Sequence, residues 1–438
     1  MRLTFYGGAQ EVGRVSMLLE DIHDNKKNLL LDCGIKLGET TEYPLLHDDE
    51  LLRIRNISVS HAHLDHSGYL PHVYSKKARP KIFMTKPTRD LIGVLLADYQ
   101  RIQASKHEGK RLFGSKDVED VMRDANIMEY LETFKADFNV TFHPAGHIMG
   151  SAMTMIEHGH KKILFSGDIC TRKTRVLDPC ERGLHCDTLI VENTYGSKED
   201  IVPSYKESYQ KMITIIKETI DKGGHVIIPS FAVGRAQEVL LALDDYMRSG
   251  AIPQTKIFID GMIGKAMKIY RHNAIYANDD IKRRILMSED DPFKSPNFHH
   301  PRSKTKEDVL KEPCIIVTTS GMLSGGPVLS YLEKLGGDPK NALIFVGYQA
   351  EGTTGNKVLQ GENGRKINIY GNEVELKLRV ESIRLSGHAD FNELIQFIGS
   401  IKGLKKVFLM HGEKTELKDA IEHKYDTVVP RQLDTYSV

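Results

Sequence analysis

The sequence predicts an α/β protein in which a strand-rich unit is interrupted by a second unit of alternating strands and helices. Short β-rich runs separated by turn residues fill roughly the first 200 residues. From about residue 204 apolar strands alternate with helical stretches, and after about residue 368 amphipathic strands return. Because 438 residues exceed what one hydrophobic core usually serves, we expect at least two domains.

The first segment, residues 1–203, is expected to contain mainly strands. Apolar and β-branched runs are separated by turn formers in RLTFYGG, VSMLLEDI, KNLLLDCGI and RNISVSH. A helical pattern covers roughly residues 88–105. Strands then return in NVTFHPAGH, AMTMIEHG, KKILFSGDI and DTLIVENTYG.

The middle segment, residues 204–368, differs from the first in that strands alternate with helices. Helical stretches near residues 205–222 and 237–248 alternate with the strands HVIIP, TKIFIDG, CIIVTTSG and ALIFVGY. Strands that are apolar on both faces and alternate with helices are typical of a parallel sheet flanked by helices. The last segment, residues 369–438, starts with VELKLRVESIRLSGH and ends after the strand KKVFLMHGE. We expect it to rejoin the first domain.

Composition excludes several classes of protein. Lys and Arg number 60 against 59 Asp and Glu, so the chain lacks the basic excess of a protein that binds nucleic acid over its whole surface. The longest apolar stretches are strand-sized, which predicts no membrane partner, and MRLTFYGGAQ lacks the apolar core of a secretory signal. Five cysteines without a C-x-x-C pair favour free thiols in the cytoplasm. Cys180 and Cys186 have an unusual spacing for a metal site.

The stretch SVSHAHLDHSG, residues 58–68, crowds three histidines and an aspartate directly after an apolar run. His61 and His63 are two residues apart at the end of a strand, so their side chains leave the same face. Asp65 and His66 follow in the turn, where the chain can curl back toward them. A surface loop has no folding reason for so many imidazoles, whereas a bound metal ion supplies one.

Three further candidates follow apolar strands far along the chain, namely His147 in PAGHIMG, Asp168 in FSGDI and His411 in FLMHGE. Histidine nitrogens and aspartate oxygens without cysteine form the donor set of a catalytic zinc site. Seven donors exceed the need of one tetrahedral ion, but two ions that share a carboxylate use them all. Taken singly, such residues are more often hydrogen-bonded core histidines and turn-forming aspartates. The combined spacing favours the metal.

These motifs resemble the metallo-β-lactamase superfamily, and the resemblance covers both ends of the chain. It implies an αββα sandwich and two Zn²⁺ ions per chain. The residues that match the ligands of the first ion are His61, His63 and His147. Those that match the ligands of the second are Asp65, His66 and His411, and Asp168 would bridge the two ions.

Further motifs are similar to the β-CASP nucleases, the branch that contains ribonuclease J. They are Glu192 in VENTYGSK, PSFAVGRAQEVL at residues 229–240, and His388 in SGHAD. The similarity implies an inserted β-CASP domain over residues 204–368. The motifs HAHLDHSGYLP and SGMLSGGP most resemble those of archaeal homologues of the cleavage and polyadenylation specificity factor. We expect this form to lack the KH domains that some of them carry.

The resemblance implies a zinc-dependent ribonuclease that cuts single-stranded RNA, as an endonuclease, a 5′-to-3′ exonuclease or both. A hydroxide between the two ions would attack phosphorus in line, and Asp65 would hydrogen-bond this nucleophile as well as ligate. His388 is the candidate general acid for the departing 3′-oxygen. Glu192 would orient His388, as a carboxylate does for imidazoles elsewhere.

The inserted domain is expected to form the groove for RNA. The segment SGMLSGGP, residues 320–327, has glycines that expose backbone N–H groups to a phosphate, although a plain turn is the alternative. Arg235 begins a helix and would face a phosphate there, unless it forms a surface salt bridge. Basic runs at residues 75–81 and 299–306 are more often solvated than RNA-binding. The predicted RNA contacts are Arg235, Ser320, Gly321, Gly325 and Gly326.

Two other functions stay open at this stage. A small-molecule metallohydrolase is disfavoured because it does not need the middle segment, and a catalytically silent RNA-binding partner is disfavoured because all seven ligand positions are filled. The resemblance also suggests a homodimer through the C-terminal segment and association with other RNA-processing or exosome-like factors. The sequence leaves open the mode of cleavage, the preferred RNA sequence and the choice between zinc and manganese.

Overall fold

The computed structural model describes residues 1–438 except 25, 39, 106–111, 289 and 302–307. The chain forms two compact units. Unit 1 comprises Met1–Lys173, Leu177–Ile201 and Gly387–Val438. Unit 2 comprises Thr174–Val176 and Val202–Ser386. The second unit is thus an insertion in the sequence of the first.

Unit 1 contains two seven-stranded sheets. One sheet has the strand order β22 (Thr435–Ser437), β1 (Arg2–Gly7), β2 (Ser16–Glu20), β3 (Asn28–Leu31), β4 (Asn56–Ser58), β5 (Lys81–Met84) and β6 (Ala125–Ile127). The other has the order β21 (Asp426–Val428), β20 (Lys406–Met410), β11 (Thr188–Glu192), β10 (Lys161–Phe165), β9 (Ala152–His158), β8 (Phe138–Pro144) and β7 (Thr133–Ala136). The pairs from β3 to β6 are parallel, as are those joining β10, β11, β20 and β21.

The two sheets of unit 1 pack face to face through a core of apolar side chains. Phe5 and Met17 from the first sheet share this core with Phe165 and Phe408 from the second, and the rings of Phe5 and Phe408 lie 5.6 Å apart. These positions alternate with residues that point outward, because successive side chains of a strand leave opposite faces.

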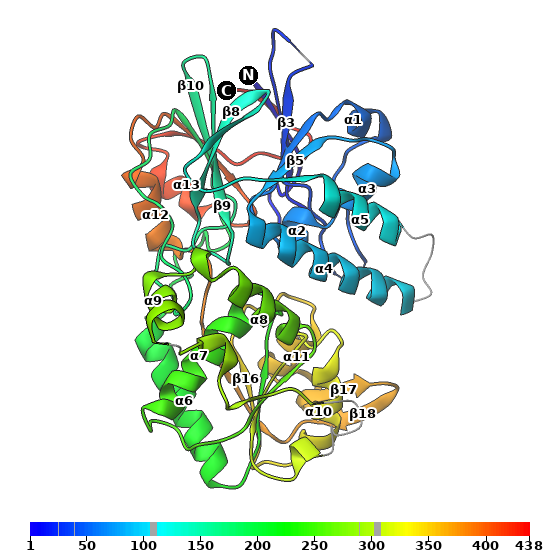
Figure 1. Ribbon diagram of the computed structural model, residues 1–438, viewed down its shortest axis with the longest axis vertical. Helices are drawn as coiled ribbons and strands as arrows, with labels where there is room; N and C mark the ends of the chain where they lie inside the picture. Colours follow the sequence, from blue (N-terminus) through cyan, green and yellow to red (C-terminus); the bar gives the residue numbers. More distant parts are fainter. Residues whose placement is uncertain (25, 39, 106–111, 289, 302–307) are drawn as a thin grey trace. The chain divides into compact units, whose positions relative to one another are not determined.

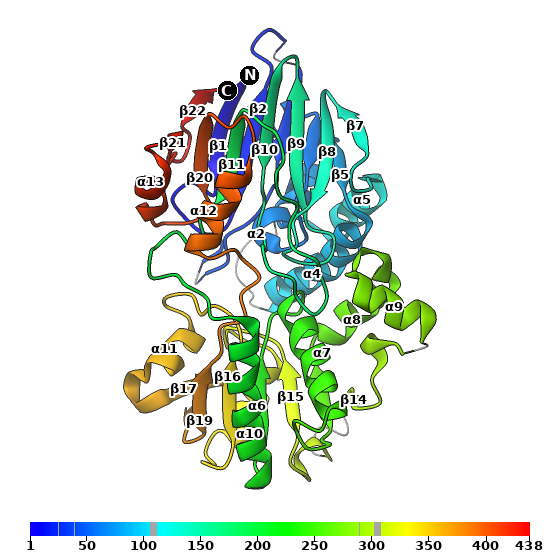
Figure 2. The same cartoon turned by 90° about the vertical axis from the view of Figure 1, so that its left-hand side faces the viewer.

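Helices cover the outer faces of the two sheets, which completes an αββα sandwich (Figures 1 and 2). Leu394 and Phe397 of α12 (Phe391–Ser400) pack with Leu189 and Leu409 of the second sheet. The helices on the outer side of the first sheet are α1 (Asp48–Arg53), α2 (Leu64–Ser67), α3 (Leu70–Ser75), α4 (Lys86–Ser105) and α5 (Ser115–Asp124). Those on the second are α12 (Phe391–Ser400) and α13 (Glu416–Ile421).

Unit 2 is built on a six-stranded sheet in which neighbouring strands pair in parallel. Its order is β14 (Phe298–His299), β13 (Ile257–Asp260), β15 (Ile315–Thr318), β12 (Val226–Pro229), β16 (Ala342–Phe345) and β19 (Arg379–Ser382). Its helices are α6 (Tyr205–Asp221), α7 (Arg235–Arg248), α8 (Ile263–His272), α9 (Asp279–Met287), α10 (Pro327–Leu335) and α11 (Thr354–Gln360). Short 3₁₀ turns are η1 (Ala274–Tyr276), η2 (Pro292–Lys294), η4 (Asp308–Leu310) and η5 (Glu362–Arg365).

Helices lie on both faces of the unit 2 sheet (Figure 1). Tyr331 and Leu332 of α10 pack on Ile316 and Leu343 of the sheet, whereas α6 and α7 lie on the other side. The apolar strands and the helices between them thus follow the parallel pattern expected from the sequence.

The compact second unit extends to Ser386, beyond the expected boundary at residue 368. The physical reason is that β19 pairs with β16 and so extends the sheet. The hairpin of β17 (Lys366–Ile369) and β18 (Asn372–Glu375) precedes β19. Leu376 and Leu378, which follow the hairpin, join the core of this unit.

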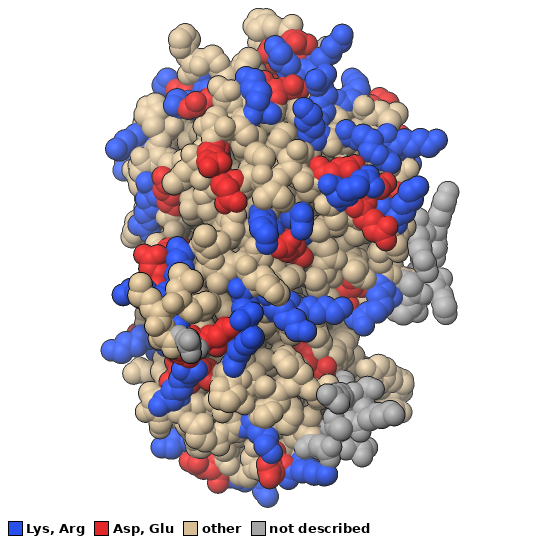
Figure 3. Space-filling model, in the orientation of Figure 1, with Lys and Arg blue, Asp and Glu red and all other residues tan. Residues whose placement is uncertain are grey.

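Charges of both signs are interspersed over the face drawn in Figure 3, in keeping with a net charge of +1. In the basic run 75–81, Lys76 pairs with Asp48, and Arg79 lies over the ring of Tyr74. The basic run 299–306 falls largely outside the described residues. Within the part of the chain that the structure describes, a helix with the length and hydropathy of a membrane span is absent.

Candidate metal centre

The seven predicted ligands lie in unit 1. Asp65 and His66 are in the short helix α2, not in a turn as expected, and the other five lie in loops that follow strands. His61 comes three residues after β4, Asp168 three residues after β10, and His411 directly after β20. His147 lies in the connection between β8 and β9. The carboxyl ends of these strands bring residues that are far apart in sequence to one edge of the sandwich.

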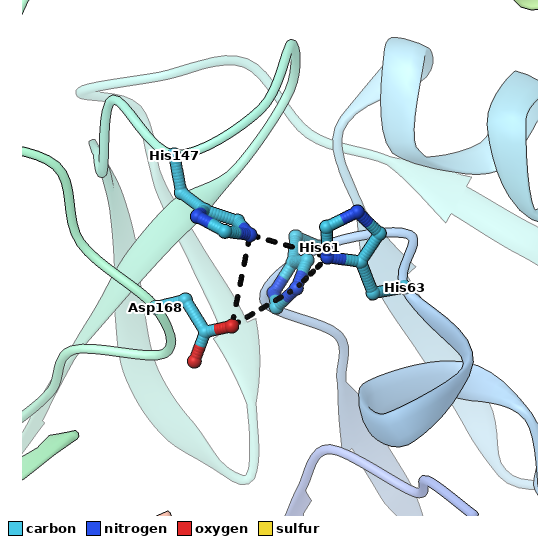
Figure 4. A group of neighbouring side chains, drawn as sticks. All are labelled: His61, His63, His147 and Asp168. Carbon is cyan, nitrogen blue, oxygen red and sulfur yellow. Dashed lines mark hydrogen bonds and ion pairs between the residues drawn. The ribbon is translucent and has the colours of Figure 1, made fainter. Parts of the chain in front are cut away.

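A first group of four side chains points into a common space (Figure 4). The distance from His63 Nδ1 is 3.2 Å to His61 Nε2 and 3.1 Å to His147 Nε2. Asp168 Oδ2 lies 3.5 Å from His61 Nε2 and 3.7 Å from His147 Nε2. Three ring nitrogens and a carboxylate oxygen therefore converge on one point, as the ligands of a metal ion do.

A second group surrounds the other oxygen of the same aspartate. Asp168 Oδ1 lies 3.4 Å from His66 Nε2 and 3.4 Å from His411 Nδ1. His411 Nε2 lies 3.4 Å from Asp65 Oδ2. The structure thus brings all seven predicted residues together, with Asp168 between the two groups.

Buried polar atoms without a hydrogen-bond partner test whether these residues fit a metal ion. Three of the ten such atoms among the described residues belong to the two groups, namely His66 Nε2, Asp168 Oδ1 and His411 Nε2. Leaving one buried polar group unsatisfied costs about 1–3 kcal/mol, so native proteins rarely do so. A divalent cation bound between these atoms would satisfy them. The nitrogen and oxygen donors are those that zinc takes in catalytic sites, and the residues therefore fit the group.

The electrostatics of His61, His147 and Asp168 favour the protonation states of metal ligands. For His66, burial lowers the pKa, but the carboxylates of Asp168, Asp65 and Asp32 outweigh it and raise that pKa well above its usual value. Burial lowers the pKa of His61 and of His147 well below the usual value, so both rings are neutral near pH 7. Burial alone would raise the pKa of Asp168, but the neighbouring His66 and His411 outweigh it and hold that pKa well below its usual range. Neutral imidazole and ionised carboxylate are the forms that bind metals.

Residues behind the ligands fix the orientation of the rings, and the sequence analysis missed them. Asp32 accepts a hydrogen bond from His66 Nδ1 at 2.6 Å and is itself held by the backbone N–H and hydroxyl of Ser60. His147 Nδ1 donates to the carbonyl of Gly387 at 2.8 Å. Asp32 ends the apolar run LLLD, so the strand-end rule that selected Asp168 would also have found it.

Replacing Asp32 by asparagine is expected to lower the metal affinity of the protein about 10–100-fold. The amide still accepts a hydrogen bond from His66, but it lacks the charge that holds and polarises the ring. The affinity is measured by zinc titration against a competing chelator. Asp137→Asn is the matched control, because Asp137 accepts a hydrogen bond from Asn56 outside the cluster. An unchanged affinity in Asp32→Asn would contradict this role.

Glu192 and His388 form a pair beside Asp168, and the ring of His388 lies 4.5 Å from the ring of His147. The last residue of β11 is Glu192, whose buried Oε2 lies 2.7 Å from His388 Nδ1. Glu192 also accepts hydrogen bonds from the backbone N–H of Ile169 and from the hydroxyl of Thr194, both at 2.6 Å. Burial lowers the pKa of His388, but the Glu192 carboxylate outweighs it and raises that pKa to about 9.

The predicted RNA contacts lie in unit 2, at the carboxyl ends of neighbouring strands. Arg235 is the first residue of α7, which follows β12, and the segment 320–327 follows β15. The Ser320 hydroxyl donates to the Gly325 carbonyl at 3.0 Å, so this loop closes on itself. A Cβ atom on Gly321 would lie 3.1 Å from the backbone nitrogen of Phe231, so that glycine allows the loops to approach closely.

Comparison with known proteins finds relatives that span the chain. The RNase J-like protein of Methanocaldococcus jannaschii is 38% identical, with 94% of this chain and 92% of that protein aligned. The transcription termination factor FttA of the same organism is 36% identical, with 100% of this chain and 72% of that protein aligned. A solved protein of unknown function from Enterococcus faecalis V583 has a TM-score of 0.60 at 12% identity over 99% of both chains. That structure shows a shared fold.

Histidine and aspartate donors at the strand ends of an αββα sandwich define a metallohydrolase. Three family models match the chain: the metallo-beta-lactamase superfamily over residues 10–218, the Beta-Casp domain over 236–358, and the Zn-dependent metallo-hydrolase RNA specificity domain over 373–430. The chain belongs to the β-CASP branch of the metallo-β-lactamase superfamily. The predicted fold class is confirmed, and the protein is a metal-dependent hydrolase of a nuclease family.

Proposed function

We propose that this protein hydrolyses the phosphodiester bonds of single-stranded RNA with two zinc ions and with His388 as the general acid. The observation that carries the proposal is the arrangement around Asp168. Its two carboxylate oxygens face two groups of candidate ligands, and the Glu192–His388 pair lies beside them. Two groups around one carboxylate match the requirement of a two-metal phosphodiesterase, whereas one ion would leave several donors unused.

Bound at this site, the ions would lower the pKa of a water molecule and stabilise negative charge on a phosphate. The residues of the chain supply the rest of the reaction. Asp65, half-buried beside the second group, would hold the attacking water in place. As the new oxygen–phosphorus bond forms, the bond from phosphorus to the 3′-oxygen breaks. His388 gives its Nε2 proton to that oxygen. The proton lost by the water passes to the solvent, and His388 takes a proton from the solvent before the next turnover.

Glu192 would hold the acid in its working state. Its carboxylate fixes the His388 ring through Nδ1 and favours the imidazolium form. Because Glu192 is itself held by Ile169 and Thr194, it has little freedom to turn away. A preoriented, charged donor is what protonation of an alkoxide leaving group needs.

RNA would be held by unit 2 residues at the carboxyl ends of the parallel strands, where ligands commonly bind in such sheets. We propose that Arg235 and the 320–327 segment contact the RNA backbone, through the residues Arg235, Ser320, Gly321, Gly325 and Gly326. The homodimer and the exosome-like partners stay predictions. Relatives named transcription termination factors extend well beyond this chain, whereas the RNase J-like relative aligns over 92% of its length.

Cleavage of a circular single-stranded RNA by the zinc-loaded protein tests the proposed function. An opened circle would establish cleavage at internal bonds, because a circle has no free end. A linear RNA with a 5′-monophosphate runs on the same gel, and Arg235→Gln is compared with the control Arg2→Gln in unit 1. An intact circle with a shortened linear RNA would establish a 5′-exonuclease. Survival of both RNAs at full metal loading would refute the ribonuclease.

A further inference from the structure

The loop that carries His388 is irregular. Besides the Glu192–His388 pair, further contacts hold its backbone and the helix cap that follows it. His147 Nδ1 donates to the carbonyl of Gly387, and the backbone N–H of Ala389 donates to the carbonyl of Ile169, both at 2.8 Å. The third contact comes from Arg172, in the segment that follows Asp168. The first contact involves His147, a candidate ligand, and the second involves Ile169, which follows the candidate ligand Asp168. The third has no place in the reaction described so far.

Arg172 joins two carboxylates at the start of α12. Its Nη2 donates to Asp390 Oδ2 at 2.6 Å, and its Nε donates to Glu393 Oε1 at 2.5 Å. The side chain of Arg172 is 21% exposed, and those of Asp390 and Glu393 are 5% and 16% exposed. A planar guanidinium that meets two shielded carboxylates in this way forms a strong and directional contact.

The two carboxylates that Arg172 holds also form the N-terminal cap of α12. Asp390 Oδ1 accepts a hydrogen bond from the backbone N–H of Glu393, and Glu393 Oε2 accepts one from the backbone N–H of Asp390, both at 3.0 Å. The outer oxygens of this capping box are those that bind Arg172. Without the guanidinium, two like charges would stand side by side on the first turn and repel each other.

We propose that Arg172 is a positioning residue that sets the place of His388 relative to Asp168. His388 lies two residues before the cap of α12, and Arg172 lies four residues after Asp168. Through its contacts with Asp390 and Glu393, Arg172 therefore connects the segment that carries His388 to the segment that carries Asp168. The inference rests on the proposed function, in which His388 protonates the leaving oxygen. A general acid displaced by about 1 Å loses a factor of about 10² in rate.

The test compares two leaving groups in Arg172→Gln and in wild type, both loaded with zinc. Hydrolysis of RNA requires protonation of an alkoxide, whereas a p-nitrophenyl ester of thymidine 5′-monophosphate releases a phenolate that needs no proton. We expect kcat for RNA to fall about 10²-fold, with KM for RNA, zinc content and kcat for the p-nitrophenyl ester little changed. The matched control is Arg123→Gln, since Arg123 also bonds two carboxylates of unit 1, those of Asp120 and Asp124.

A double-mutant cycle separates positioning from general stability. If Arg172 acts through His388, Arg172→Gln adds no loss of RNA cleavage in a His388→Ala background. Equal losses in both backgrounds, or equal losses for both leaving groups, would overturn the proposal. Should Arg172→Gln melt or lose zinc, Glu393→Gln decides instead, because glutamine preserves the cap but removes one charge that Arg172 holds. An RNA-inactive wild type, or a fully active His388→Ala, would instead refute the proposed function itself.

Discussion

Replacing Asp168 by alanine is expected to abolish metal binding at both groups and RNA cleavage with it. Asp168 presents one oxygen to His61 and His147 and the other to His66 and His411. Its removal leaves each group without its shared negative charge. Metal ions supply several kcal/mol of transition-state stabilisation, so the rate should fall at least about 10³-fold, since each 1.36 kcal/mol is a factor of ten.

Two measurements test this prediction: the zinc content of the protein and its rate of RNA cleavage. If the site holds two metal ions, the wild type should contain about two zinc ions per chain. Asp168→Ala should contain less than about one. Chelation of the wild type should lower its melting temperature, because a ligand that binds only the folded state stabilises that state. The control is Asp187→Ala. Asp187 lies outside the cluster, directly before β11, and accepts a hydrogen bond from the backbone N–H of Lys162. An Asp168→Ala variant that keeps its zinc would contradict the bridging role.

Replacing His388 by alanine is expected to slow RNA cleavage about 10²–10⁴-fold, the range that general acid catalysis contributes. The reason is that the leaving 3′-oxygen then departs without a proton donor, while the seven predicted ligands, His61, His63, Asp65, His66, His147, Asp168 and His411, stay in place. The zinc content and the affinity for uncleaved RNA should therefore be unchanged. Rates are measured under single-turnover conditions, so that product release does not conceal the chemical step.

His143→Ala is the matched control for His388→Ala. His143 is also a histidine of unit 1 whose Nδ1 pairs with a carboxylate, that of Glu181 at 2.8 Å. It lies outside the described groups that could hold a metal ion. The control should cleave RNA at nearly the wild-type rate. A loss in His388→Ala that comes with loss of zinc would mean that His388 is a ligand and not the acid.

Local patterns in the sequence predicted much of the site. His61, His63, Asp65 and His66 share one turn, so their proximity follows from the chain itself. His147, Asp168 and His411 each follow an apolar run, and side chains at the carboxyl ends of neighbouring strands meet at one edge. The change from short strands to strands alternating with helices likewise predicted the inserted parallel unit.

The tertiary structure decided what depends on which distant segments become neighbours. Asp32 and His66 are 34 residues apart, and Arg172 and Asp390 are 218 apart, so no local period connects either pair. The extent of unit 2 depended on β19 pairing with β16, an arrangement that strand propensity leaves open. Sequence therefore determined which residues are the candidates for the metal chemistry, because donor type and strand-end position are local properties. Only packing decided which atoms face the site and what holds them there, because those contacts form between segments that the chain order keeps apart.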